Sequence, residues 1–209
     1  LGEVERLAGE YPQAREYHSQ GLSLARDLGY RPGEVLALRG LGEVERLVGE
    51  YGQARKDYTQ ALTLARDLGD RRGEVLALRG LGEVERLVGE YGQAREYHGQ
   101  ALSLARDLGD RRGEVLALWG LGEVERLVGG YGQAREYHTQ ALSLARDLGY
   151  RPGEAEALWG LGQVASDTAE RSHAYELWRE ALEIYEDIGV RETVRAAMLQ
   201  LVVDPTAEV

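Results

Sequence analysis

The sequence predicts an all-α fold, a solenoid in which antiparallel helix pairs stack one after another. Two observations lead to this fold class. A shift of 40 residues superimposes the chain on itself, and inside each unit the apolar residues recur at spacings of three and four. A helix pair of this size cannot bury its apolar face alone, so successive pairs are expected to stack on one another.

Four copies of the repeat are nearly intact, and a fifth has diverged. Residues 41–80 and 81–120 differ at only six positions, which indicates recent duplication or deliberate design. The fifth copy begins LGQVASDTAERSHAYELWRE at Leu161. We predict one domain with repeats at 1–40, 41–80, 81–120, 121–160 and 161–189, followed by a capping helix over 190–203 and a tail over 204–209.

Each repeat is predicted to contribute two helices, so the chain should hold about eleven. Around the second and third copies, helix A should run from about residue 72 to 88 and helix B from about 92 to 108. Gly89 is placed to stop helix A, Gly109 to form a left-handed cap, and Asp110 to cap the next helix A. Pro12 stands in the first turn of a helix B, where proline is tolerated.

Composition excludes several classes of function. With 43% hydrophobic residues the chain can bury a core, and no apolar run approaches the length of a membrane span. The net charge of −11 argues against a nucleic-acid surface. The absence of cysteine fits a reducing compartment, so we expect a cytoplasmic location. The chain opens on Leu1 in the middle of a unit, which suggests a fragment of a longer protein.

Glycine-rich stretches in the repeat do not predict a nucleotide site. The segment GLGEVERLVGEYG from Gly80 resembles a dinucleotide fingerprint but has Glu85 where that motif needs glycine, and the surrounding pattern is helical. A phosphate loop needs Gly-Lys-Ser or Gly-Lys-Thr, and the only lysine, Lys56, is followed by Asp57. No cofactor is predicted.

One helix-B position carries a ring in every copy: His18, Tyr58, His98, His138 and Trp178. Exchange among these residue types indicates a packing site with a polar edge. A metal site is disfavoured because no paired ligand set accompanies the histidines.

The carboxylates also recur in every intact copy, whereas an active site is normally a single constellation. Glu83 and Arg86 are three residues apart and can pair along the helix, so a solvated, self-paired face is predicted. We therefore predict that the chain is not an enzyme.

The residues of the repeat resemble the signature of the tetratricopeptide repeat. The third copy matches that family's signature at Leu81, Gly82, Gly89, Tyr91, Ala94, His98 and Ala101. The resemblance implies a right-handed superhelix whose A helices line a concave groove that binds peptides or proteins. The 40-residue unit is similar to the repeats of spindle-orientation adaptors rich in Leu-Gly-Asn, of kinesin light chains, and of arrays attached to bacterial signalling ATPases and transcriptional regulators.

The repeat departs from the family pattern at two positions. A family tyrosine is replaced by Glu45, Glu85 and Glu125, and the asparagine that often precedes Leu-Gly in the similar adaptors is glycine here, as at Gly80. The peptide clamp of that asparagine therefore does not carry over. We expect Gly80 to face the groove, so Gly80→Ala should be neutral or stabilising, whereas Gly82 should let helix A approach helix B closely.

The family's groove-facing positions map onto five series in helix A, at 36/76/116, 39/79/119/159, 43/83/123/163, 46/86/126 and 47/87/127, and three of these series carry the site residues that we predict. The residues are Arg39, Arg79, Trp119 and Trp159; Glu43, Glu83 and Glu123; and Arg46, Arg86 and Arg126. The series at 39 varies while its surroundings stay fixed, and it offers carboxylate and apolar contacts. We predict that this face binds a peptide or protein with acidic and apolar residues, as an adaptor or sensor segment of a larger signalling protein.

Three alternatives stay open from sequence. Trp119 and Trp159 could stack on each other instead of binding a partner. Nearly identical repeats with an uncapped first repeat could associate end to end into a structural array. An engineered scaffold without a ligand is the third alternative, and the diverged fifth copy argues against it.

Overall fold

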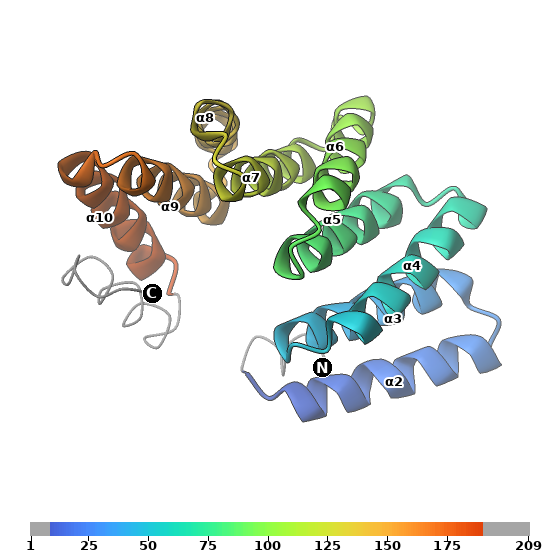
Figure 1. Ribbon diagram of the computed structural model, residues 1–209. Helices are drawn as coiled ribbons and strands as arrows, with labels where there is room; N and C mark the ends of the chain where they lie inside the picture. The colour runs from blue at the N-terminus through green and yellow to red at the C-terminus, as the bar shows by residue number, and fades with distance from the viewer. Residues whose placement is uncertain (1–8, 190–209) are drawn as a thin grey trace. The chain divides into compact units, whose positions relative to one another are not determined.

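A computed structural model of the chain describes residues 9–189, and within that range it contains nine α-helices and no strand (Figure 1). The all-α prediction is therefore confirmed. The first eight residues, the expected capping helix 190–203 and the tail 204–209 lie outside the described residues. The helices are α2 (Tyr11–Asp27), α3 (Arg31–Leu47), α4 (Tyr51–Leu68), α5 (Arg71–Leu87), α6 (Tyr91–Leu108), α7 (Arg111–Leu127), α8 (Tyr131–Leu148), α9 (Arg151–Asp167) and α10 (Arg171–Asp187).

The helices belong to two compact units, Leu1–Gly113 and Glu114–Val209. In the first unit each helix from α2 to α5 packs against the next one along the chain, and α3 also contacts α5. In the second unit α9 packs against both α8 and α10. Helix A of the predicted repeat corresponds to α3, α5, α7 and α9, and helix B to α2, α4, α6, α8 and α10, so the expected stacking of pairs is confirmed inside each unit.

Local capping sets the helix boundaries. Gly89, after α5, and Gly109, after α6, adopt φ values of 85° and 65°, so both helices are followed by a residue in the left-handed conformation. Asp110 caps the helix that follows, because its Oδ1 accepts a hydrogen bond of 3.0 Å from the backbone N–H of Gly113. The predicted boundaries are right to within one residue. Tyr91, expected in the turn, is the first residue of α6.

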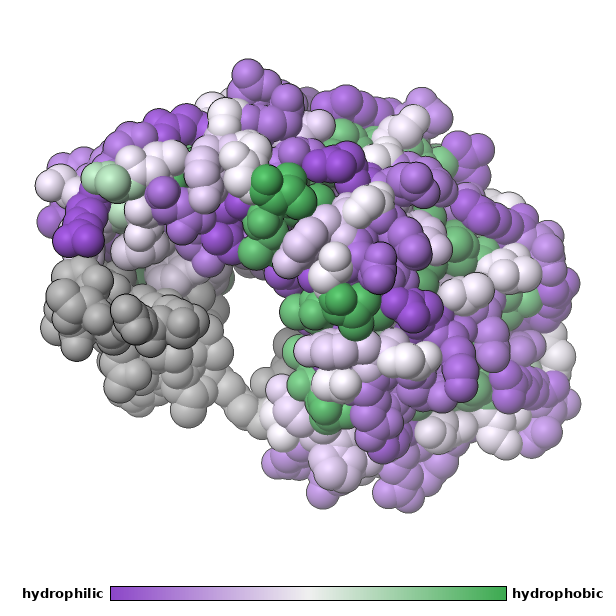
Figure 2. Space-filling view, in the orientation of Figure 1, coloured by the Kyte–Doolittle hydropathy of each residue, from purple (hydrophilic) through white to green (hydrophobic). Residues whose placement is uncertain are grey.

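One face of the molecule is mostly polar (Figure 2). The face shown in Figure 2 is largely hydrophilic, with apolar side chains in small separate patches. Among residues 9–189, no helix is both long enough and apolar enough to cross a membrane.

A ring held between two glycines organises the packing of the helix pairs. Tyr58 on α4 is 4% exposed, and a Cβ atom added at Gly80 on α5 would collide with its ring, while one added at Gly42 on α3 would lie 3.0 Å from it. In the second unit the ring of His138 lies in the same way between Gly122 and Gly160. The prediction that this helix-B position is a packing site is confirmed.

The expected exposure of Gly80 is wrong. This glycine is buried against the ring of Tyr58, which belongs to the preceding helix B. The sequence pattern placed Gly80 correctly on helix A but did not show that the neighbouring pair brings a ring against it. Gly82 does allow the close approach that was predicted, because an added Cβ there would lie 2.7 Å from the imidazole of His98.

We therefore expect Gly80→Ala to destabilise the fold by about 1 to 3 kcal/mol, since the new methyl group overpacks a buried ring. Denaturant unfolding followed by circular dichroism measures the change. Gly52→Ala is the matched control, because Gly52 is helical and exposed with open space around it, so the substitution should be neutral or stabilising. Combining Gly80→Ala with Tyr58→Ala should remove most of the clash, and equal costs in both backgrounds would contradict the contact.

Candidate functional site

The predicted site residues lie on the A helices of both units. In the first unit Arg39, Glu43 and Arg46 follow one another along α3, and Arg79, Glu83 and Arg86 repeat the arrangement on α5. In the second unit Trp119, Glu123 and Arg126 lie on α7 and Trp159 on α9. We call these residues, taken separately in each unit, the A-helix face. Nine of the ten are half-buried, and Glu123 is buried.

Glutamate and arginine pair along each of these helices, as the three-residue spacing predicted. Arg46 donates from Nε and Nη2 to the two carboxylate oxygens of Glu43, at 3.0 and 2.8 Å. Arg86 donates to Oε2 of Glu83 at 3.2 and 2.9 Å. Most of the charge that these arginines could offer a ligand is therefore balanced inside the protein.

A ring from helix B also contacts the glutamate of each glutamate–arginine pair. The hydroxyl of Tyr58 donates to Oε2 of Glu43 at 2.9 Å. Nε2 of His98 lies 3.4 Å from Oε1 of Glu83, and Nε2 of His138 lies 3.3 Å from Oε1 of Glu123. The polar edge expected of the packing ring is thus directed at the glutamate of the A-helix face.

The prediction that these carboxylates form a solvated face is wrong. The side chain of Glu83 is 17% exposed and that of Glu123 is 5% exposed, because the helix-B ring and the arginine cover them. The sequence showed the glutamate and the arginine on one helix, but it did not show that the ring of the facing helix meets the same carboxylate.

Two of the clusters lower the pKa of their carboxylate. Burial alone would raise the pKa of Glu83, but contact with His98 and the charge of Arg86 outweigh it and lower the pKa to about 2. The same balance of burial, His138 and Arg126 lowers the pKa of Glu123. In the first cluster, burial and the neighbouring Glu43 raise the pKa of Tyr58, so the phenol stays protonated and can donate.

The glutamates that replace the family tyrosine link successive helix pairs. Arg55 on α4 donates from Nε and Nη2 to both oxygens of Glu85 on α5, each at 2.6 Å, and Glu85 is 1% exposed. Arg15 on α2 donates to Glu45 on α3 at 2.6 Å. No partner was predicted for these glutamates, although an arginine lies 30 residues before each of them in the sequence.

The fifth copy lacks this link. Ala165 stands at the glutamate position, and Arg135 on α8 pairs instead with Glu170 at 2.5 Å, where both side chains are about two-fifths exposed. The arginine of the repeat is therefore retained while its buried partner is lost.

Arg79 differs from Arg46 and Arg86, two other arginines of the A-helix face. Within the described part of the chain it has neither a hydrogen bond nor an ion pair, although its side chain is half-buried. Arg46 and Arg86, by contrast, are held by their glutamates. Arg79 therefore presents a guanidinium whose five donors remain available to an anionic group.

Trp159 uses part of its surface for packing. Its ring centroid lies 5.5 Å from that of Trp178 on α10, and Nε1 of Trp178 donates to the backbone carbonyl of Trp159 at 3.3 Å. Trp159 and Trp119 are both half-buried, so each also leaves apolar surface uncovered.

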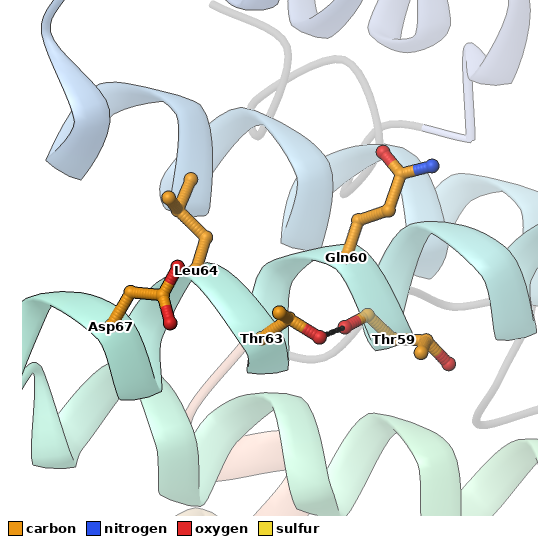
Figure 3. Close-up of a pocket in the computed structure, with 5 residues that line it drawn as sticks. All are labelled: Thr59, Gln60, Thr63, Leu64 and Asp67. Carbon is orange, nitrogen blue, oxygen red and sulfur yellow. Dashed lines mark hydrogen bonds between the residues drawn. The ribbon is translucent and has the colours of Figure 1, made fainter.

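A shallow pocket of about 230 Å³ lies on helix B, away from the A-helix face. Figure 3 shows its lining on α4, and Thr63 Oγ1 donates to the backbone carbonyl of Thr59 at 2.9 Å. Since these hydroxyls are engaged by their own helix, the pocket offers few free polar groups. Its lining residues are Thr59, Gln60, Thr63, Leu64 and Asp67.

Metal ligation finds no support in residues 9–189, where no group of three or more histidine, aspartate or glutamate side chains could hold an ion. Each buried histidine of the described clusters faces a single glutamate.

Comparison with known sequences gives one family. A family model of the tetratricopeptide repeat matches the chain in four overlapping windows, at residues 1–67, 34–107, 73–147 and 113–187. No curated protein sequence matches the chain.

Solved structures share the fold at low sequence identity. BtubC from P. vanneervenii is 19% identical, with a TM-score of 0.71 and coverage of 85% of this chain and 74% of its own. A Rap protein complexed with Competence and Sporulation Factor is 15% identical with a TM-score of 0.86, and the match covers 96% of this chain and 56% of the Rap chain. The putative kinesin light chain repeats of Podosopora anserina are 14% identical with a TM-score of 0.65, covering 90% of this chain and 93% of theirs.

Removing one partner of a buried ion pair should be costly. We expect Arg55→Ala to destabilise the fold by about 2 kcal/mol, because it leaves the buried carboxylate of Glu85 without its two donors while the exposed side of the pair admits some water. Arg135→Ala is the matched control at the same position of the repeat, and its cost in denaturant unfolding should be clearly smaller. Equal costs would mean that burial of the glutamate does not set the strength of the link.

The stability of the fold should depend on the charge of Glu83. Its folded pKa of about 2 lies below the ordinary carboxyl value of 4.5, so the folded state binds this proton less readily than the unfolded state does. The stabilisation is complete above pH 4.5 and is lost as the pH falls from there toward 2. Glu83→Gln should therefore flatten the acid limb of a plot of unfolding free energy against pH.

The control for that experiment is Glu96→Gln, which changes an exposed glutamate on the neighbouring helix α6. It should leave the acid limb as steep as in the parent chain. An unchanged slope in Glu83→Gln would show that this carboxylate titrates alike in the folded and unfolded states.

Proposed function

This chain belongs to the tetratricopeptide repeat family, and we propose that its A-helix face binds an extended or helical segment of a partner protein that carries acidic and apolar side chains. The segment would not be changed chemically, and the chain would serve as an adaptor or sensor part of a larger cytoplasmic signalling protein. The observation that carries the proposal is the half-buried Arg79, which has no partner among the described residues while Arg46 and Arg86 do.

The paired clusters support this role by fixing the shape of the face. Glu83 is held by Arg86 and His98, so its side chain has little freedom to lose when a ligand arrives. The surface around Arg79 is rigid and nearly neutral. The available guanidinium therefore favours binding of a ligand carboxylate at Arg79 over binding of a charged ligand group elsewhere on the face. Because the chain carries a net charge of −11, attraction of an acidic ligand must come from such local groups.

The tryptophans supply the apolar part of the proposed recognition. Trp119 and Trp159 are half-buried, and aromatic side chains with some uncovered surface are enriched at binding hot spots. Peptide binding is also consistent with the fold, since a similar solved structure, 16% identical with a TM-score of 0.82, is a Rap conjugation gene regulator in complex with the Phr* peptide.

End-to-end self-association stays a second prediction. It requires the last repeat of one molecule to match the first repeat of another molecule. The fifth repeat, however, differs from the intact repeats at many positions. Sedimentation over a concentration series separates this role from peptide binding, because a dilute monomer that still binds a peptide would favour the adaptor.

Selection from a phage-displayed random peptide library on the 209-residue chain tests the proposed function. Enriched peptides should contain aspartate or glutamate beside apolar residues. Synthetic versions, titrated by fluorescence anisotropy, should bind Arg79→Ala at least about tenfold more weakly, because the charge-assisted hydrogen bonds are lost. The double change of Trp119→Ala and Trp159→Ala should also weaken binding while helicity is kept.

Arg72→Ala is the control for Arg79, since Arg72 is an exposed arginine on the same helix α5. Its affinity for the selected peptides should equal that of the parent chain. If the Arg79 variant and the double tryptophan variant both bind the peptides as tightly as the parent chain does, the A-helix face is not the binding surface.

A further inference from the structure

Arg79 and Glu83 lie four residues apart on α5, a spacing at which opposite charges on one helix commonly pair. They do not pair here. Arg79 has neither a hydrogen bond nor an ion pair within the described part of the chain, and Glu83 uses its Oε2 to accept from Arg86 at 2.9 Å. The availability of Arg79 therefore depends on what holds the carboxylate of Glu83 away from it.

The other oxygen of Glu83 faces His98 on α6. Oε1 is buried and lies 3.4 Å from Nε2 of His98, a contact longer than a strong hydrogen bond. The imidazole is 1% exposed, and within residues 9–189 neither of its nitrogens has a hydrogen-bond partner. The polar contact that the structure shows for this buried ring is therefore the one with Glu83.

Gly82 lets the imidazole reach this oxygen. A Cβ atom added at Gly82 would lie 2.7 Å from Nε2 of His98, so the ring edge that bears Nε2 lies directly against the backbone beside Glu83. A buried carboxylate oxygen without a polar neighbour is costly. If the nitrogen edge of the ring were absent, rotation of the Glu83 side chain toward Arg79, one helical turn away, would give that oxygen a donor.

Other copies of the repeat associate a polar ring with the glutamate. One copy earlier, the hydroxyl of Tyr58 donates to Glu43 at 2.9 Å. In the fifth copy the glutamate is replaced by Gln163, and the ring of Trp178 donates instead to a backbone carbonyl at 3.3 Å. Where the carboxylate is lost, the polar atom of the ring is therefore directed elsewhere.

We propose that His98 is a positioning residue for ligand binding, because by holding Glu83 it keeps the guanidinium of Arg79 available to a carboxylate of the partner. The inference rests on the proposed function for its ligand, whereas the state of Arg79 can be measured without a ligand. It gives the ring a role beyond packing. Phenylalanine at position 98 would fill much of the same space but would lose the contact with Glu83.

Reaction of the 209-residue chain with phenylglyoxal measures how available each arginine is, because a guanidinium held by a carboxylate reacts more slowly. An endoproteinase that cleaves before aspartate releases residues 70–106 as one fragment, in which mass spectrometry resolves Arg72, Arg79 and Arg86. In the parent chain Arg79 should react faster than Arg86. His98→Phe should slow the reaction of Arg79 by about threefold or more, and the rate of the exposed Arg72 should not change.

Two further variants separate positioning from packing. His98→Tyr introduces the ring that Tyr58 provides one copy earlier, so its hydroxyl should restore the parent rate at Arg79. Combining His98→Phe with Glu83→Gln removes the competing carboxylate and should also restore that rate, which a change of packing alone would not do. Circular dichroism checks that each variant is folded, and His98→Met replaces His98→Phe if the latter unfolds the chain.

The selected peptides should follow the same order, with binding about threefold weaker in His98→Phe and restored in His98→Tyr and in the double variant. An unchanged Arg79 rate in folded His98→Phe would overturn the positioning role, even if Arg79→Ala weakens peptide binding. A slowed rate that Glu83→Gln does not restore would also overturn it. If the rates follow the expected order while Arg79→Ala binds the peptides as the parent chain does, the proposed function fails and the control of Arg79 by His98 stands.

Discussion

Contact between a helix-B ring and the glycines of two A helices is the constraint on which the rest of the structure depends. The ring of Tyr58 is wedged against Gly42 of its own pair and Gly80 of the next one, so one side chain sets the spacing of three helices. This packing also directs the polar edge of the Tyr58 ring at Glu43, and the equivalent imidazole of His98 contacts Glu83. Packing and electrostatics of the A-helix face therefore share one cause: the absence of a side chain at two positions of each helix A lets the ring reach the carboxylate.

Sequence patterns predicted what is decided locally. The glycine caps, the Asp110 cap and the limits of α5 and α6 follow from residues that lie within one helical turn of each feature. The burial of Gly80 and the environment of Glu83 and Glu85 could not be predicted in the same way. Those properties arise between helices 15 to 30 residues apart, and the pattern along a single helix gives no information about them. At Glu85 the recurring arginine 30 residues earlier was an available signal, whereas nothing within α5 pointed to the ring that covers Glu83.

The repeats also separate what stabilises the array from what could recognise a ligand. A ring, two glycines and a glutamate beside them recur in the intact copies, and the ring packs against the glycines and contacts the glutamate. Within helix A of the intact copies, the position of Arg39, Arg79 and Trp119 changes its residue type, and these side chains are half-buried at the surface. A constant framework with one changeable position per helix A allows the chemistry of a surface to vary without altering how the helices pack.

The replacement of a buried glutamate by Ala165 has a consequence for how the array comes apart. In a repeat protein the free energy of folding is close to a sum of terms for single repeats and terms for the interfaces between neighbours. Between α4 and α5 the interface term includes the buried bidentate pair of Arg55 and Glu85, whereas the equivalent arginine of α8, Arg135, pairs with the exposed Glu170, and Arg146 of α8 supplies a further pair to the buried Glu154 of α9. The weaker coupling makes the fifth repeat the natural starting point of unfolding, so its amide hydrogens should exchange through openings that leave the earlier repeats folded.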